Sequence, residues 1–245
     1  QRQMCIRDSI KFMLKTFELE NDVTYRFSRW DPANADKYVG TAADWEKTES
    51  VMKKILDDLN IEYTEAWGEA AFYGPKLDVQ GTNVHGKEDT LFTVQLDFAL
   101  AERFDMIYID ENGEKARPLI IHRSSIGCYE RTLAMLIEKY NGAFPLWMAP
   151  EQVRVLSLTD RTADNAKAVA RELTAAGLRA NADVRSEKLG KKIREAQLEK
   201  VPYVLVIGDK EAEQGVVAVR QRTEGDIGTM QVLSLIHISE PTRHL

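Results

Sequence analysis

The sequence predicts two domains: an α+β domain with an antiparallel sheet, followed by a three-layer α/β domain with a largely parallel sheet. Two observations predict this. Residues 23–122 contain several strand-like segments and only one long helix, whereas residues 153–222 alternate strand and helix with short links. The segment 141–150, NGAFPLWMAP, is rich in turn formers and is the best candidate for the boundary between them.

The composition excludes several classes of protein. The chain has 245 residues, of which 44% are apolar and 29% charged, as in globular proteins rather than collagen-like or disordered ones. No apolar run approaches the ~20 residues of a membrane-spanning helix. With a net charge of −6, nucleic-acid binding needs a local basic patch. Cys5 and Cys128 form neither a disulfide framework nor a zinc cluster, so we expect a cytoplasmic protein.

The two ends of the chain look foreign. Residues 1–9 (QRQMCIRDS) and 233–243 (LSLIHISEPTR) resemble translated adapters of transposon-based sequencing libraries, with a shared end in opposite orientation. The alternative is a natural disordered N-terminus and a short apolar C-terminal strand. We expect residues 1–9 and 233–245 to be adapter-derived and the natural segment to be truncated at both ends. Three residues are therefore left out of the candidate sites: Cys5, His237 and His244.

The elements of the first domain follow from hydrophobic periodicity. Residues 23–29 alternate apolar and polar, which predicts a half-buried strand. In residues 41–60, Trp45, Met52 and Leu56 recur at helical spacing and predict an amphipathic helix. Further strands are expected at 63–67, 76–80, 91–98, 106–109 and 119–122, and a helix over 125–140 that buries Leu133, Leu136, Ile137 and Tyr140.

The second domain is predicted to alternate strands and helices. Apolar strands are expected at 153–158, 179–184, 203–207 and 216–222, with helices over 162–176 and 187–200 between the first three. Gly177 closes the first of these helices. Strand–helix–strand–helix–strand with short links predicts parallel neighbours and helices on both faces of the sheet.

Two segments of the first domain could line a pocket. Gly74-Pro75 forces a turn, so Tyr73 and Lys76 are presented rather than buried. In strand 91–98, Gln95 shares one face with Thr93 and Asp97. On the wall of a pocket, Gln95 would offer a donor and an acceptor at fixed geometry. An ordinary hairpin and a solvent-facing strand fit the same patterns.

A third group surrounds the predicted helix over 125–140. His122 ends the preceding strand; a lone histidine is more often structural than a metal ligand, and with His85 and Cys128 it matches no zinc spacing. Gly127, near the helix start, lets a backbone or a ligand approach closely. Arg131, preceded by Glu130, can meet a phosphate with a fork of donors.

The second domain carries one cluster of cations. Residues 185–194 (RSEKLGKKIR) hold five Lys and Arg in ten positions at the start of a predicted helix, and Arg220 and Arg222 lie on a later strand. Such a cluster is usually a solvated helix face. Its placement also suits contact with an RNA backbone while other side chains read bases.

Taken in order, these segments resemble a known family. FYGPKLD, TVQLDF, IHR, GCYER, FPLWMAP, RSEKLGKKIRE, VPYVLVIGDKE and VAVR are similar to the C-terminal half of bacterial threonyl-tRNA synthetases, over about residues 23–230. The resemblance implies that residues 10–148 are the C-terminal part of a class II catalytic domain, built on an antiparallel sheet. It implies that residues 149–232 form an anticodon-binding α/β domain.

The resemblance also implies roles for the catalytic-domain residues. Gly127, Glu130 and Arg131 fall in the third class II motif, whose arginine binds the terminal phosphates of ATP. Tyr73, Lys76 and Gln95 match residues that line the amino-acid and adenylate pocket. His122 matches one of three ligands of a zinc ion that binds threonine through its amino and hydroxyl groups and so excludes valine. Thr90 stands where many members carry glutamine.

The anticodon contacts of the family fall on four residues of the second domain. They are Ser186, Arg194, Glu211 and Arg220. Ser186 departs from the asparagine expected at that position, which puts that contact in doubt.

The implied activity is that of a threonine–tRNA ligase. With ATP and Mg²⁺ it forms threonyl-adenylate and then transfers threonine to the 3′ end of tRNA-Thr, as a homodimer. The first two class II motifs, the other two zinc ligands and the editing domain would precede residue 9, so we expect the fragment itself to be inactive. We also expect a poorly stable first domain and an independently folding second one.

Two alternatives compete with this reading. A noncatalytic synthetase-like module that only binds tRNA would be expected to lose Arg131, His122 or Tyr73, and all three are present. A related synthetase for proline, histidine or glycine shares the anticodon domain. It does not account for His122 together with FYGPK and TVQLDF.

Overall fold

The computed structural model describes residues 2–124 and 126–238, and the chain divides into two compact units, 1–135 and 136–245. The division falls inside helix α4 (Tyr129–Tyr140), upstream of the 148/149 boundary that the turn-rich segment suggests. The boundaries of the functional domains therefore stay predictions, and each unit is described by itself.

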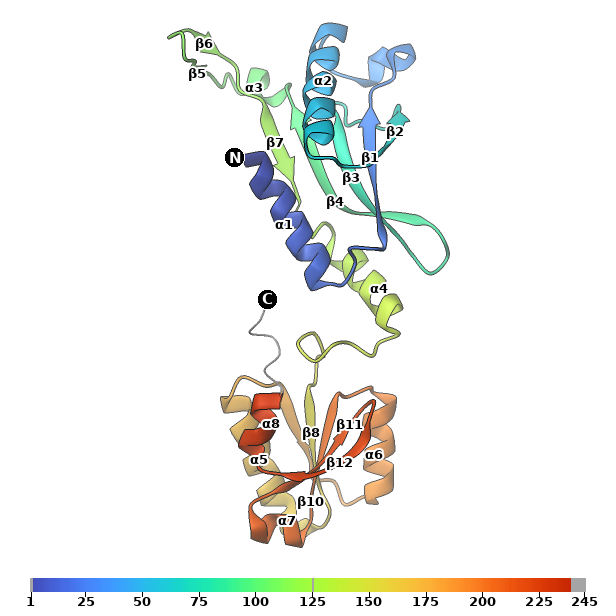
Figure 1. Cartoon of the computed structure of the whole chain (residues 1–245), viewed down its shortest axis with the longest axis vertical. Helices are drawn as coiled ribbons and strands as arrows, with labels where there is room; N and C mark the ends of the chain where they lie inside the picture. The colour runs from blue at the N-terminus through green and yellow to red at the C-terminus, as the bar shows by residue number, and fades with distance from the viewer. Residues whose placement is uncertain (1, 125, 239–245) are drawn as a thin grey trace. The chain divides into compact units, whose positions relative to one another are not determined.

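Unit 1 is built on a five-stranded sheet in the order β2-β1-β3-β4-β7 (Figure 1). Its strands are β1 (Val23–Arg29), β2 (Thr64–Trp67), β3 (Lys76–Thr82), β4 (Glu88–Asp97) and β7 (Ile120–Arg123). β1, β3, β4 and β7 pair antiparallel, as expected. The expectation is wrong for β2, which pairs parallel to β1. The reason is that helix α2 crosses between them, and such a crossover returns the chain in the same direction.

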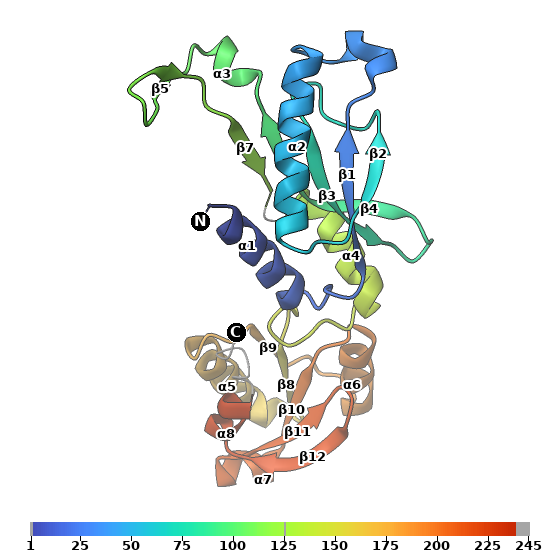
Figure 2. The same cartoon turned by 45° about the horizontal axis from the view of Figure 1, so that its top comes forward.

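Two helices lie over the same face of this sheet, α1 (Arg2–Thr16) and α2 (Ala42–Asp58) (Figure 2). Thr41 and Asp44 form a reciprocal capping box at the start of α2. The helix then buries Met52 and Leu56 against strand residues such as Phe27, as the helical spacing predicts. Trp45 is fully buried near the beginning of α2, stacked on Trp30 with ring centroids 5.6 Å apart.

The expected burial of the helix over 125–140 is partly wrong. The helix α4 begins at Tyr129, and Leu133 and Ile137 are 52% and 46% exposed. Leu136 is buried as predicted, and Met135, which was not predicted, is buried as well and lies beside Gly81 of β3. The helix has apolar residues on two sides, so periodicity alone does not select the side that meets the sheet. A short helix, α3 (Leu100–Arg103), and a separate hairpin of β5 (Tyr108–Ile109) and β6 (Lys115–Ala116) complete unit 1.

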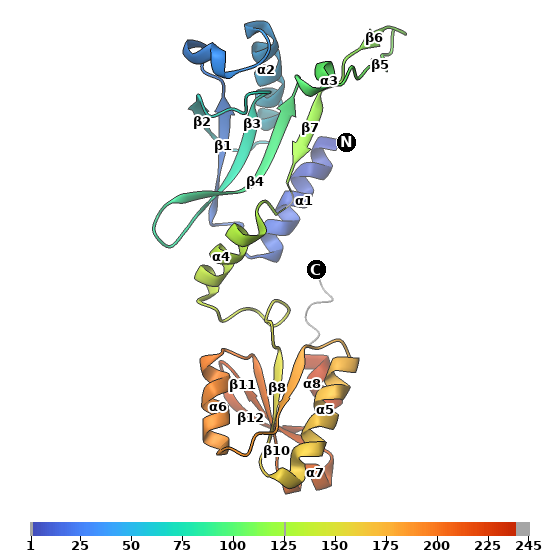
Figure 3. The same cartoon turned by 180° about the vertical axis from the view of Figure 1, so that it is seen from behind.

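Unit 2 is a three-layer α/β domain with strand order β12-β11-β10-β8-β9. Strands β8 (Val153–Ser157), β9 (Ala180–Asp183) and β10 (Tyr203–Ile207) are parallel, and β11 (Val217–Gln221) and β12 (Gly225–Met230) are antiparallel to their neighbours. Helices α5 (Ala163–Ala175) and α8 (Val232–Ile238) lie on one face, α6 (Leu189–Leu198) lies on the other (Figure 3), and α7 (Asp209–Gln214) follows β10. The sequence pattern did not predict β12, α7 and α8.

The two faces of this sheet have separate cores. Val155, Leu205 and Leu235 pack with α5 on one face, and Leu156 and Ala196 pack on the face of α6. Leu235 belongs to the segment expected to be adapter-derived and is nevertheless fully buried. Its packing does not test where that segment comes from.

The segment that joins α4 to β8 is held by side chains of unit 2. The guanidinium of Arg179 donates to the carbonyl oxygens of Ala149 and Trp147 at 2.9 and 2.7 Å. Arg222 donates to those of Ala143 and Phe144 at 3.1 and 2.9 Å. Within residues 2–124 and 126–238, no helix combines the length and apolar character needed to cross a membrane.

Candidate functional site

The sheet of unit 1 has one apolar and one polar face. Alternation in β3 and β4 directs Leu77 and Leu96 toward α2, and the intervening polar side chains toward the opposite side. The polar residues on this side include Lys76, Asp78 and Gln80 of β3, Thr93, Gln95 and Asp97 of β4, Ser28 of β1 and His122 of β7. The polar face is the candidate site.

Tyr73, Gln95 and His122 come together on this face. The Tyr73 hydroxyl donates to Gln95 Oε1 at 2.5 Å, and the rings of Tyr73 and His122 have centroids 5.6 Å apart. Gln95 and His122 are direct partners across the β4–β7 pair. Burial, together with the negative charge of Asp97, raises the pKa of Tyr73, so its hydroxyl is a neutral donor at pH 7.

Gly74 allows this arrangement by a close backbone approach. A Cβ at Gly74 would lie 1.7 Å from the carbonyl oxygen of Leu96 in β4. The turn that presents Tyr73 can therefore rest against β4 only if residue 74 has no side chain.

We predict that Gly74→Ala destabilises unit 1 by about 2–3 kcal/mol, because the added carbon must push the turn off β4. The matched control is Gly190→Ala in α6, where nothing lies within 4 Å of the added carbon. Native-state amide hydrogen exchange of β4 measures both. Unchanged protection of β4 in Gly74→Ala would contradict the close approach.

Lys76 is fixed by a buried carboxylate that the sequence reading did not single out. Lys76 Nζ lies 2.7 Å from Asp78 Oδ2, and Asp78 is 2% exposed. Asp78 also accepts hydrogen bonds from the hydroxyls of Thr93 and Ser28, the second at 3.3 Å. The alternation of polar residues along β3 was the available signal, since Lys76 and Asp78 are two residues apart.

His122 is oriented by a second buried carboxylate, that of Asp97. His122 Nε2 lies 2.8 Å from Asp97 Oδ2, and Asp97 is 0% exposed. Asp97 Oδ1 accepts the backbone N–H groups of Ala99 and Leu100 at 2.8 and 2.9 Å. The sequence placed Asp97 on the face of Gln95 but assigned it no role.

This geometry bears on the metal site that the resemblance implies. When Nε2 carries the proton donated to Asp97, Nδ1 is left as a ligand atom, and a carboxylate behind the imidazole is the usual partner of a metal-binding histidine. Among the residues that the structure describes, no group of three or more His, Cys, Asp or Glu side chains is placed to hold a metal ion. His122 fits one ligand of a site that other residues would complete.

Arg131 lies at the other end of β4. Its guanidinium donates to the carbonyl oxygen of Thr90 at 3.2 Å, and the side chain is exposed. At ~3.4 Å per residue, the Cα atoms of Thr90 and Gln95 are about 17 Å apart. The structure thus places Arg131, in α4, against the strand that carries Gln95 without bringing the two side chains together.

Gly127 and Glu130 lie beside Arg131. Gly127 has φ +67°, and a Cβ there would lie 2.1 Å from the carbonyl oxygen of Leu91. The close approach that its position suggested is therefore made by the backbone of β4. Glu130 is exposed, and its carboxylate accepts from Cys128 Sγ at 3.0 Å, which lowers the pKa of Glu130.

The cation cluster of unit 2 is smaller than its sequence suggests. Arg185 pairs with Asp183 and Glu195, both at 2.6 Å, Lys191 pairs with Glu187 at 2.7 Å, and Lys192 is buried. Within the described part of the chain, Lys188 and Arg194 alone of the five make no ion pair and remain exposed. The expectation for Arg222 is also wrong: its guanidinium donates to backbone carbonyls, and burial lowers its pKa.

The four residues predicted to contact the anticodon fall at two places in unit 2. Ser186 is exposed in the loop after β9, and Glu211 lies in α7, after β10, where its carboxylate accepts the N–H of Gly208 at 2.9 Å. Arg220 is the cross-strand partner of Val204, which packs against α6. Arg220 therefore lies on the face of the sheet that is covered by α6, the helix that carries Arg194. Arg220 also lies 3.5 Å from Asp226.

Comparison with known proteins agrees with both halves of this description. Residues 31–140 match the tRNA synthetase class II core domain (G, H, P, S and T), and residues 152–239 match the anticodon binding domain. A threonine–tRNA ligase of Clostridium perfringens is 58% identical over 94% of the chain, and one of Listeria monocytogenes is 51% identical over 91%. The chain spans 36% and 35% of the lengths of these relatives.

A solved structure gives the same result in three dimensions. The crystal structure of the RNA binding domain of threonyl-tRNA synthetase from Cryptosporidium parvum superposes with a TM-score of 0.85 and 32% identity, over 97% of this chain and 59% of that one. The core-domain match is shared by five amino-acid specificities, but the relatives just described are named for threonine alone. The chain belongs to the threonyl-tRNA synthetase family, as a class II core fragment followed by an anticodon-binding domain.

Proposed function

We propose that this chain is part of a threonine–tRNA ligase that forms threonyl-adenylate from threonine and ATP and transfers threonine to the 3′ end of tRNA-Thr. The observation that carries the proposal is the 58% identity to a threonine–tRNA ligase over 94% of the chain. The cluster of Tyr73, Gln95 and His122 on one polar sheet face supports it.

The contacts of the pocket residues support the roles that we propose for them. Tyr73 presents a neutral hydroxyl, and Gln95 holds that hydroxyl in place. Lys76, fixed by Asp78, puts a positive charge on the same face, where it suits the anionic adenylate. A zinc ion held by His122 and two further ligands would bind the amino and hydroxyl groups of threonine.

The ATP site is proposed at the other end of β4. Arg131 offers a fork of donors to the terminal phosphates, next to Glu130 and to the backbone turn at Gly127. Mg²⁺ would neutralise the same phosphates. A cytoplasmic homodimer is the remaining part of the proposal and rests on the family resemblance. By itself, we propose, this chain binds RNA and does not activate threonine.

Unit 2 is proposed to read the anticodon through Ser186, Arg194, Glu211 and Arg220. Arg194 is the strongest of the four on structural grounds, because it is exposed and makes no ion pair with the residues that the structure describes. Its five donors are therefore available to RNA.

We predict that the whole chain prefers an RNA stem-loop with a threonine anticodon over one with a changed base by ~1–3 kcal/mol per base. Arg194→Ala is expected to lose most of this preference, because it removes a fork of donors. Arg171→Ala, an exposed arginine of α5 on the opposite face, is the matched control. Equal, salt-dependent binding of both loops to the unaltered chain would reject anticodon reading.

A further inference from the structure

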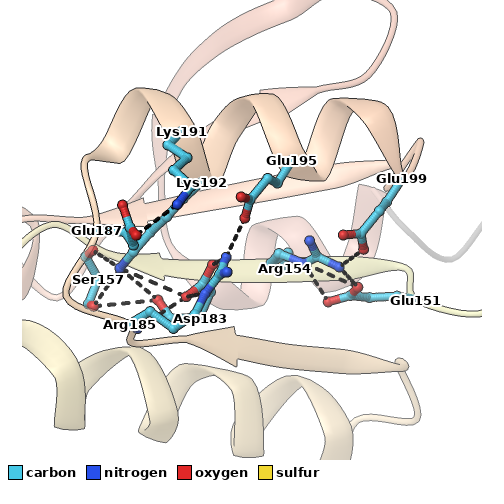
Figure 4. A network of polar contacts seen from close by, with 10 residues as sticks. All are labelled: Glu151, Arg154, Ser157, Asp183, Arg185, Glu187, Lys191, Lys192, Glu195 and Glu199. Carbon is cyan, nitrogen blue, oxygen red and sulfur yellow. Dashed lines mark hydrogen bonds and ion pairs between the residues drawn. The ribbon is translucent and has the colours of Figure 1, made fainter.

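Lys192 is a buried cation beneath the loop that carries Ser186. The residue is 1% exposed, and its Nζ donates to the carbonyl oxygens of Ser157 at 3.1 Å and Asp183 at 3.2 Å (Figure 4). Nζ also lies 3.5 Å from Ser157 Oγ and 4.0 Å from Asp183 Oδ1. Ser157 ends β8 and Asp183 ends β9, so one ammonium ties α6 to the carboxyl ends of two neighbouring strands.

The burial of this ammonium gives the tie its strength. A lysine has three donors, and an unpaired one inside a protein is costly. Among the described residues, the hydrogen-bond and ion-pair partners of Nζ all belong to Ser157 and Asp183. The first turns of α6 therefore cannot move away from the strand ends without leaving a buried charge unpaired. The contact therefore fixes position as well as contributing stability.

The same strand end holds the loop from its other side. Arg185 donates to Asp183 through Nε at 2.9 Å and through a second nitrogen at 2.6 Å, and also to Glu195 of α6 at 2.6 Å (Figure 4). Glu187 pairs with Lys191 at 2.7 Å. The hydrogen bonds of Arg185 keep the pKa of Asp183 below its ordinary value. Segment 184–188 is thus tied at both ends to β9 and α6.

This segment forms one wall of a cleft at the carboxyl edge of the sheet. The cleft has a volume of about 600 Å³ and is lined by residues 157–160 on one side and by 185–188 and Lys192 on the other. Ser186 and Lys188 are the exposed side chains of this wall that are not committed to an ion pair among the described residues. Open α/β sheets bind their ligands at such an edge.

We propose that Lys192 is a positioning residue for anticodon recognition. It does not touch the RNA; it sets the placement of segment 184–188 and of the start of α6, and so of Ser186 and Arg194. The inference rests on the proposed function, because it presumes that unit 2 reads the anticodon. It differs from the ordinary role of a lysine in such a cluster, which is to neutralise a phosphate.

The two roles predict different results for two lysines four residues apart. In the whole chain, Lys192→Met is expected to reduce an anticodon preference of about 5- to 150-fold to less than about twofold, with the salt dependence unchanged. Lys188→Met is expected to weaken binding to both loops alike and to reduce the slope of log K against log[salt] by about 0.7–1. Lys167→Met, on α5 and outside the cleft lining, controls for the loss of one charge.

Binding is measured with the cognate stem-loop and the changed-base stem-loop at two salt concentrations, and amide hydrogen exchange is measured on each variant. Faster exchange in residues 184–191, with β10 still protected, is the expected signature of a released loop. A folded Lys192→Met variant that keeps the full anticodon preference overturns the inference. If that variant also shows a smaller slope of log K against log[salt], Lys192 contacts phosphate instead.

A second variant guards against loss of folding. Asp183→Asn keeps the size of the side chain and the backbone carbonyl that Lys192 uses, but removes the charge between Lys192 and Arg185. Like Lys192→Met, Asp183→Asn is expected to lower the preference for the cognate loop. If Lys192→Met does not fold, a folded Asp183→Asn that keeps the full preference overturns the inference. Failure of the unaltered chain to prefer the cognate loop is a separate result, which rejects the proposed function.

Discussion

His122→Ala is expected to abolish zinc binding and threonine activation together when this chain is completed with the upstream region of its Clostridium perfringens relative. With Nε2 of the imidazole held by buried Asp97, Nδ1 is the ring nitrogen that His122 can offer to a metal ion. Loss of a ligand's hydrogen-bond partner lowers metal affinity ~10- to 100-fold. Loss of the ligand itself should lower zinc affinity by more than this.

Zinc content and threonine-dependent exchange of pyrophosphate into ATP are the measurements. His85→Ala is the matched control, since His85 is exposed in the turn between β3 and β4. An enzyme that keeps one zinc per chain after His122→Ala would remove His122 from the proposed ligand set. Loss of activity with zinc retained would assign His122 to threonine contact instead.

Asp97→Ala is expected to destabilise unit 1 by about 1–3 kcal/mol for each N–H group that loses its acceptor inside the protein. The substitution leaves the N–H groups of Ala99 and Leu100 without their acceptor and releases His122. In the completed enzyme it should also weaken zinc binding ~10- to 100-fold, because the imidazole loses its orientation.

Asp97→Asn separates the two effects. Its amide oxygen can still accept the two backbone N–H groups, so we expect most of the stability to remain while zinc binding falls. Hydrogen exchange of β4 measures stability, and Asp36→Ala, an exposed aspartate of the same unit, is the control. Equal losses of stability in Asp97→Asn and Asp97→Ala would mean that charge, rather than the backbone hydrogen bonds, is what Asp97 contributes.

The sequence predicted those features that repeat along the chain. The alternation of Thr93, Gln95 and Asp97 predicted a polar face, and the structure places all three on it. The parallel order of β8, β9 and β10 followed from the alternation of strand and helix. The class II core and the anticodon-binding domain, inferred from the motifs in order, are confirmed by the family matches.

Features that depend on distant partners were not predicted. Leu133 and Leu136 look alike in the sequence, and only their surroundings in the fold distinguish the exposed one from the buried one. Lys192 looks like its neighbour Lys191, yet one ammonium lies under a loop and the other pairs with Glu187 at the surface. Periodicity records which faces of an element are apolar, not which element comes to meet them.

The contacts of Arg179 and Arg222 with the segment before β8 determine where unit 2 can be cut out for study. Their guanidinium groups are satisfied by carbonyl oxygens between Ala143 and Ala149. The turn-rich composition of 141–150 suggests residue 150 as the start of an excised domain. Such a domain would lack the carbonyl oxygens to which Arg179 and Arg222 donate. A domain that starts upstream of Asn141 keeps the backbone segment 143–149. We expect limited proteolysis to leave this segment uncut while unit 2 is folded.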